Sequence, residues 1–266
     1  MKNFKNLILG LKFAFSYFTV IPVKFKEDDN LSTKSVMSYM LLFLPISGVV
    51  LSLILLSVYF TLYDLGFLSA VIASSIYFLL YGFLHTEGVI DVVDAIYAKH
   101  SGKDPYKVIK ESTVGAMGIL YSVLLVILKI SIFSYMLLNE YFLELVLIIF
   151  LSRFSILFTI FFYQFKSSFV TLLSDSISIN KSFILFFILS VLGIYTLGFF
   201  SFIFFMIIAT ILTMIINKFL KSNLGFLNGD CLGTLLEILE IVLPLIILSI
   251  KRAPPMKLLL ITHYLL

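Results

Sequence analysis

The sequence predicts an all-α, polytopic integral membrane protein with about six to eight transmembrane helices. Of its 266 residues, 61% are hydrophobic and 13% are charged, whereas a soluble domain has about 45–50% apolar and about 25% charged residues. Several uninterrupted apolar runs are long enough to span about 30 Å of hydrocarbon. These runs lack the alternation of a β-barrel, so each must satisfy its backbone hydrogen bonds as a helix. No internal repeat or low-complexity tract is visible, and we expect one membrane domain over residues 1–266.

The N-terminal segment, residues 1–23, predicts an amphipathic helix that lies at the membrane interface or packs on the other helices. Its lysines are interspersed with Phe, Leu and Ile. Lys12 interrupts the apolar stretch and no small-residue cleavage site follows, which disfavours a signal peptide. Pro22 is expected to end this helix.

The apolar runs predict seven membrane spans. Their approximate bounds are 37–62, 66–84, 114–138, 141–163, 182–197, 200–217 and 234–250. The three short connections carry no Lys or Arg, whereas the longer segments all carry lysines; these are 24–36, 85–113, 164–181 and 218–233. By the positive-inside rule, the long segments face the cytoplasm.

The C-terminal tail conflicts with this topology. Seven spans would place residues 251–266 outside, yet the tail contains Lys251, Arg252 and Lys257. Either one span is re-entrant, or the N-terminal helix also crosses the membrane, or the charge of the tail is tolerated. The net charge of the chain is +4. In a membrane protein such a charge usually comes from the lysines of cytoplasmic loops, so we expect no nucleic acid partner. The single Cys231 excludes an intramolecular disulfide and a Cys-rich metal site.

An acidic stretch after the second span is the first candidate site. Glu87, Asp91 and Asp94 are spaced i, i+4 and i+7, which puts them on one face of a helix, within about 60° of one another. Three like charges on one face repel, and a hard cation such as Mg²⁺ would offset them through oxygen ligands. The simpler alternative is a solvated acidic patch at a helix start, which the helix dipole favours.

A basic segment follows the acidic one. Asp104 and Pro105 predict a helix start, with Lys107 and Lys110 pointing the same way and Lys103 just ahead. Carboxylates that hold a cation beside lysines that neutralise phosphate are what a metal-plus-diphosphate site requires. The ordinary positive charge of a cytoplasmic loop is the simpler explanation of these lysines.

A second acidic group begins at Asp230 and continues with Glu237 and Glu240 inside an apolar span. Carboxylates within a membrane helix are costly and usually functional. Lys129 and Arg153 also lie within predicted spans and are natural partners for these carboxylates. Such pairs would make the group structural.

Four motifs, in order and at matching spacing, resemble cobalamin synthase, the adenosylcobinamide-GDP ribazoletransferase family. They are Phe18–Pro22, His85–Ala95, Lys110–Gly118, and Gly229–Thr234 followed by Glu237 and Glu240. The resemblance covers most of the chain. Some positions depart from the family pattern: Glu87 and Glu111 replace Asp, Ala95 replaces Gly, Val20 and Thr113 replace basic residues, and Asn228 replaces Thr.

The resemblance implies the last step of nucleotide-loop assembly in cobalamin biosynthesis, in the cytoplasmic (inner) membrane of a prokaryote. A hydroxyl of α-ribazole, or of its 5′-phosphate, attacks the diphosphate of adenosylcobinamide-GDP, and GMP leaves. Mg²⁺ is the expected cofactor. The expected metal ligands are Glu87, Asp91, Asp94 and Asp230. The expected catalytic groups, among them the base, are His85, Glu237 and Glu240. The expected phosphate-binding residues are Lys103, Lys107, Lys110, Ser112 and Gly115.

Two other classes of protein share some of these features. A CDP-alcohol phosphatidyltransferase also uses an acidic array, but its Asp-Gly-x-x-Ala-Arg and Gly-x-x-x-Asp-x-x-x-Asp patterns are absent. An ion-coupled transporter would use the charged residues within the spans as a relay, but the inverted repeats typical of that class are not visible. The expected partners are the two substrates and the lipid bilayer, and the sequence allows a homo-oligomer.

Overall fold

The computed structural model describes residues 2–111 and 113–252, and within them it contains eleven α-helices, one short 3₁₀ helix and no strand. The all-α prediction is therefore confirmed. The helices are α1 (Lys2–Phe18), α2 (Lys34–Thr61), η1 (Tyr63–Leu65), α3 (Phe67–Leu80), α4 (Leu84–His100), α5 (Pro105–Val108), α6 (Ala116–Leu138), α7 (Phe142–Phe162), α8 (Ser168–Ser174), α9 (Ile179–Leu197), α10 (Phe199–Leu224) and α11 (Gly229–Arg252).

Six helices of the described chain are long and apolar enough to cross a membrane, namely α2, α6, α7, α9, α10 and α11. All seven predicted spans fall on helices, but the prediction of a continuous helix over 66–84 is wrong. Helix α3 has 14 residues and is about 21 Å long at 1.5 Å per residue, too short for a bilayer core of about 30 Å. Together with α4 it would form a seventh, broken span.

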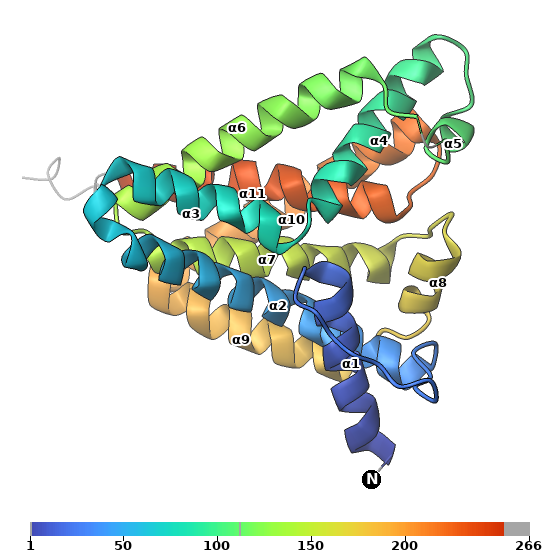
Figure 1. Ribbon diagram of the computed structural model, residues 1–266, viewed down its shortest axis with the longest axis horizontal. Coiled ribbons are helices and arrows are strands. Elements are labelled where there is room, and N and C mark those ends of the chain that lie inside the picture. Colours follow the sequence, from blue (N-terminus) through green and yellow to red (C-terminus); the bar gives the residue numbers. More distant parts are fainter. Residues whose placement is uncertain (1, 112, 253–266) are drawn as a thin grey trace, which may run out of the picture.

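The break between α3 and α4 bends the chain by 77°. Gly82 and Phe83 both adopt positive φ, at 63° and 56°, a conformation that no helix can continue through. Helix α4 then starts at Leu84, so the acidic stretch is helical from its first residue (Figure 1).

The predicted long loops are partly helical. Segment 85–113 holds most of α4 and all of α5, and segment 164–181 holds α8. Segment 218–233 is shortened from both sides, because α10 runs on to Leu224 and α11 begins at Gly229. The prediction that Asp104 caps a helix with Pro105 at its first position is confirmed, since the Asp104 carboxylate accepts the N–H of Tyr106 at 3.0 Å.

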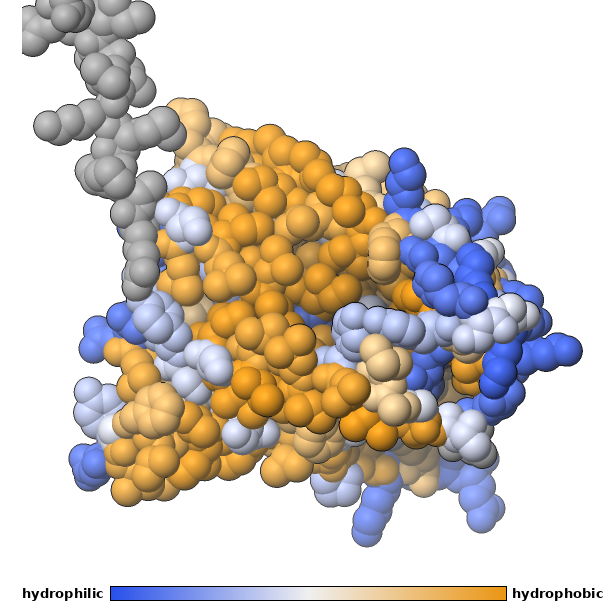
Figure 2. All heavy atoms as spheres, turned by 90° about the horizontal axis from the view of Figure 1, so that it is seen from above, coloured by the Kyte–Doolittle hydropathy of each residue, from blue (hydrophilic) through white to orange (hydrophobic). Residues whose placement is uncertain are grey.

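Helices α7 and α11 form the centre of the bundle. Most residues of α7 are buried, and Leu235, Leu239 and Leu243 on one face of α11 have no exposure. Helices α9 and α10 lie at the periphery and expose large apolar side chains, as does α6. One face of the molecule shows a broad hydrophobic band beside a hydrophilic end (Figure 2), the division expected for a bilayer-embedded protein.

The hydrophilic end carries α5, α8 and the loop before α2 (Figure 1); we call it the polar end. Helix α1 packs mainly on α2, which is one of the two arrangements expected for the N-terminal segment. At the opposite end Lys251 forms an ion pair with Glu144 at the start of α7. This pairing gives one basic residue of the tail a local partner, and Lys257 lies outside the described residues.

Candidate functional site

Helices α4 and α11 cross at close range near the polar end. A Cβ atom on Gly88 would lie 2.8 Å from the backbone oxygen of Asp230, and one on Gly233 would lie 3.1 Å from that of His85. The Thr234 hydroxyl also donates to the Gly88 carbonyl at 3.1 Å. Only glycine permits this approach of two backbones, which places the first acidic group beside the second.

The four predicted metal ligands share this neighbourhood. Asp91 lies within electrostatic reach of Asp230, Glu87 and Asp94. Glu87 is exposed, and the three aspartates are half-buried. Among the described residues, no Lys, Arg or His nitrogen lies within 4.0 Å of any of these four carboxylates. The negative charge of the group is therefore left without a protein cation.

Asp94 has a second role in the structure. Its two oxygens accept the backbone N–H groups of Gly115, at 2.6 Å, and Gly118, at 2.8 Å. It thereby caps the N-terminus of α6, which has no side-chain cap of its own. A Cβ on Gly118 would lie 2.6 Å from Asp94 Oδ2, so these glycines make room for a carboxylate. The N–H of Gly115 donates to Asp94 in this structure, and the phosphate-binding role expected of this residue stays a prediction.

The donor set suits a hard cation, but the side chains are not gathered around one point. Within the described residues, no group of three or more His, Cys, Asp or Glu side chains is arranged to hold a metal ion. Asp94 is fixed by the glycine amides, whereas Glu87 is exposed and free to rotate. All the nearby ligand atoms are carboxylate oxygens, which Mg²⁺ prefers. Binding of the ion here requires rotation of Glu87, Asp91 and Asp230.

A cavity of about 470 Å³ adjoins this crossing at the polar end. Three predicted site residues line it: His85, Lys110 and Asp230. His85 is 4% exposed and stacks on Phe18 and Tyr81, and its Nε2 atom is buried without a hydrogen-bond partner. An unpartnered buried polar atom costs about 1–3 kcal/mol, and a bound hydroxyl would remove that cost.

The cavity also has polar residues that sequence reasoning missed. Asn228 donates to Asp230 at 2.6 Å, and Lys166 approaches the ring of Tyr106. Lys166 lies in segment 164–181, whereas the predicted basic residues lie in segment 85–113. Lysines are common in cytoplasmic loops, so the sequence did not distinguish Lys166 as a site residue. Asn228 could have been found from its place in the Gly-Asp motif.

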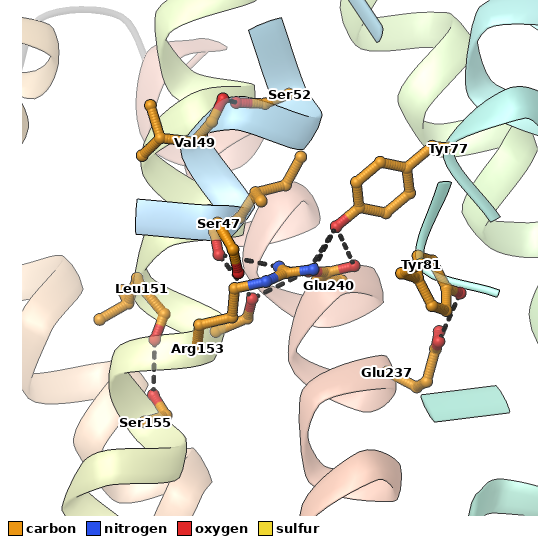
Figure 3. Close-up of polar contacts among 12 residues, drawn as sticks. Ser47, Val49, Ser52, Tyr77, Tyr81, Leu151, Arg153, Ser155, Glu237 and Glu240 are labelled. Carbon is orange, nitrogen blue, oxygen red and sulfur yellow. Dashed lines mark hydrogen bonds and ion pairs between the residues drawn. The ribbon is translucent and has the colours of Figure 1, made fainter. Parts of the chain in front are cut away.

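Glu237 and Glu240 lie further along α11 (Figure 3). Neither residue lines the cavity. Lys129 Nζ lies 2.9 Å from Glu237 and 2.5 Å from Glu240, and Arg153 Nη1 lies 2.6 Å from Glu240. The expected pairing with Lys129 and Arg153 is thus confirmed. All four side chains are at most 1% exposed.

Tyrosine and hydroxyl donors complete this buried ion cluster. Tyr81 donates to Glu237 at 2.6 Å, and Thr86 of α4 donates to the same oxygen at 3.1 Å. Tyr77 and Ser152 donate to Glu240 at 3.0 and 2.9 Å. These contacts, together with their distance from the cavity lining, favour a structural role for the two glutamates over the expected catalytic one. Through Thr86 the cluster also holds the start of α4.

Two further predicted phosphate ligands are not brought to the cavity. Lys103 and Lys107 are exposed and do not line it. Ser112 lies outside the described residues. The structure therefore assembles a site from His85, Lys110 and Asp230, with Glu87, Asp91 and Asp94 on the adjoining face of α4.

These features define a polytopic helical membrane protein with a polar cavity between an acidic helix crossing and a pair of lysines. The chain belongs to the cobalamin-5-phosphate synthase family, whose model matches residues 10–248. A Caldanaerobacter subterraneus protein named adenosylcobinamide-GDP ribazoletransferase is 24% identical over 247 residues, covering 91% of this chain and 97% of that protein.

Other relatives with the same name match over a shorter stretch. One from Clostridium perfringens is 29% identical over 125 residues, and one from Saccharolobus islandicus is 35% identical over 124 residues. These matches cover 46% of this chain, and 48% and 47% of the respective relatives, so the chain spans about half the length of these relatives. No solved structure is significantly similar to the chain. Membership of this family does not favour the alternatives that the protein is a CDP-alcohol phosphatidyltransferase or an ion-coupled transporter.

Proposed function

We propose that this protein is an adenosylcobinamide-GDP ribazoletransferase. It would join adenosylcobinamide-GDP to α-ribazole, or to α-ribazole 5′-phosphate, and release GMP. Its family and the names of its relatives support this activity. The observation that carries the proposal is the cavity where Asp230, His85 and Lys110 meet beside carboxylates that have no protein cation.

In the proposed reaction, a ribose hydroxyl oxygen of the acceptor attacks the phosphorus that carries the cobinamide. A new P–O bond forms, the bond from that phosphorus to the GMP oxygen breaks, and GMP leaves with the electron pair. The hydroxyl proton passes to a base, for which we propose His85, because this residue lines the cavity and its Nε2 atom has no hydrogen-bond partner within the described chain. The transition state spreads negative charge over phosphate oxygens, so positioning and electrostatics dominate.

We propose Mg²⁺ as the cofactor, held by Glu87, Asp91 and Asp230. Asp94 would be a further ligand, because each of its oxygens has a lone pair that the hydrogen bonds from Gly115 and Gly118 do not use. When bound, the ion would neutralise the diphosphate oxygens and orient the leaving group. Glu87 is one methylene longer than the aspartate of the family pattern, and its exposure leaves it room to reach the ion.

The proposed location is the cytoplasmic membrane of a prokaryote, with the polar end facing the cytoplasm. The lysines of the polar end support this orientation by the positive-inside rule. At the opposite end of the described chain, the positive charge of Lys251 is neutralised by an ion pair with Glu144.

A direct assay tests the proposal. Membranes that contain the protein are incubated with adenosylcobinamide-GDP, α-ribazole 5′-phosphate and Mg²⁺, and the products are quantified. We expect stoichiometric GMP and adenosylcobalamin 5′-phosphate, both lost with EDTA and recovered with excess Mg²⁺. Turnover of a CDP-alcohol substrate in place of the cobinamide would contradict the proposal.

A further inference from the structure

Tyr106 holds two lysines from different loops at the edge of the cavity. The ammonium of Lys110 lies 4.3 Å from the centre of the Tyr106 ring, and that of Lys166 lies 3.6 Å from it. Lys110 follows α5, whereas Lys166 precedes α8. All three residues line the cavity. The fold therefore brings two cations from separate parts of the chain to one aromatic ring.

This lysine pair has no counter-ion in the described part of the chain. No carboxylate there lies within 4.0 Å of either ammonium. Because both ammonium groups lie within 4.3 Å of the same ring centre, they are at most about 8 Å apart and repel each other, and the face of a tyrosine ring offsets only a small part of that repulsion. An anion that accepts hydrogen bonds from both ammonium groups would offset it fully.

The surroundings hold the pair in place. The Lys166 backbone N–H donates to the Leu227 carbonyl at 2.8 Å. The Tyr106 ring packs edge-on against Phe226 at 5.2 Å, and its backbone N–H is capped by Asp104. These contacts fix the Lys166 backbone and the Tyr106 ring that both lysines approach, which lowers the entropic cost of binding a ligand.

We propose that Lys110 and Lys166 bind the 5′-phosphate of the acceptor nucleoside, and so select α-ribazole 5′-phosphate over α-ribazole. This inference rests on the proposed function. A phosphate monoester offers three oxygens for charge-assisted hydrogen bonds to the two ammonium groups. Lys166 is the new member of the site, since neither the four sequence motifs nor the basic segment with Lys103, Lys107 and Lys110 includes it.

The position of the pair favours the acceptor phosphate over the diphosphate of the donor. The carboxylates of α4 and α11 are the groups that would hold a cation for the diphosphate. The attacking hydroxyl and the 5′-phosphate are on different carbons of the ribose. When the hydroxyl lies at the diphosphate beside the carboxylates, the 5′-phosphate therefore lies some distance from them, as the lysine pair does. The cavity joins both regions, because Asp230 and His85 line it together with the two lysines.

The test is the acceptor selectivity, defined as kcat/KM for α-ribazole 5′-phosphate divided by kcat/KM for α-ribazole at saturating adenosylcobinamide-GDP. In Lys166→Gln and in Lys110→Gln we expect this ratio to fall at least about tenfold. Lys166→Arg keeps the charge and is expected to retain most of the selectivity. Turnover of α-ribazole by the same preparation shows that each variant is folded.

Lys218→Gln is the matched control, because it removes a lysine of α10 that does not line the cavity; it should leave the ratio as in the wild type. A ratio in Lys166→Gln within about twofold of the wild type would overturn the inference, as would an equal loss of both acceptors. A raised KM for adenosylcobinamide-GDP with unchanged selectivity would assign the lysines to the donor instead, and would also overturn it. If the wild type turns over neither acceptor, the proposed function itself fails.

Discussion

Lys129 and Glu237 form an ion pair of 2.9 Å in which neither side chain is exposed. Both residues lie on helices that could span a membrane, where an isolated charge is costly. The pair is part of a cluster that also contains Glu240 and Arg153 (Figure 3). Since Thr86 donates to Glu237, the cluster stabilises the bundle and fixes α4 on α11.

Replacement of one member should unbalance this cluster. We expect Glu237→Gln to lower the free energy of unfolding by about 3–5 kcal/mol, because the two buried cations then share a single carboxylate and the cluster carries an uncompensated positive charge. The double variant Lys129→Met/Glu237→Gln restores the charge balance and should recover much of the loss. Thermal unfolding in detergent measures both effects, with Glu140→Gln, an exposed residue at the opposite end, as the control. Equal stability of Glu237→Gln and the wild type would refute the structural role.

The capping of α6 by Asp94 predicts that Gly118 tolerates no side chain. In Gly118→Ala the new Cβ would lie 2.6 Å from both Asp94 Oδ2 and the Ile90 carbonyl oxygen. We expect a loss of about 1–3 kcal/mol in stability, typical of overpacking, measured as a lower melting temperature. In Gly229→Ala the new Cβ would meet only Val170, at 4.0 Å, and this control should melt close to the wild type.

The metal proposal predicts the effect of neutralising the carboxylates. Asp91→Asn and Asp230→Asn should each reduce turnover at saturating Mg²⁺ by at least about 100-fold, since loss of one electrostatic group at a phosphoryl-transfer site costs that much. Half-activation by Mg²⁺ should also shift to higher concentration. Asp64→Asn, a change in the exposed turn at the opposite end, serves as the control. Near-normal turnover in both site variants would rule out the metal model.

His85 as the proton acceptor predicts a selective loss of kcat. His85→Gln removes the basic nitrogen but keeps a polar side chain, and we expect kcat to fall by at least about 100-fold with a smaller change in KM. Steady-state assays with both substrates varied separate the two constants. His100→Gln changes an exposed histidine of the same helix and should leave kcat unaltered. A change confined to KM would assign His85 to binding.

The apolar runs were sufficient to predict six of the seven spans, because a bilayer imposes a minimum length on each. Helix ends were harder. Helix α10 continues through Lys218 and Lys221 to Leu224 after its apolar run ends, since a helix that leaves the membrane no longer needs apolar residues. The bend after α3 depends on positive φ at Phe83, a conformation that its residue type does not signal.

The candidate site was predictable only in part. The acidic spacing and the Gly-Asp motif identified Asp91 and Asp230, because helical periodicity and local motifs are visible along the chain. The contact of Gly118 with Asp94 and that of Lys166 with Tyr106 depend on how distant segments pack. Residue type alone gives no indication of such contacts.

The buried ion cluster pairs two cations with two anions and therefore carries no net charge. A transmembrane voltage acts on each elementary charge with about 2.3 kcal/mol per 100 mV, and these contributions cancel in the net force on a neutral group of charges. Lys129, Arg153, Glu237 and Glu240 together present no net charge to that field. The net force of a changing membrane voltage on this cluster is therefore zero, which favours a constant shape of the adjoining cavity in energised and depolarised cells.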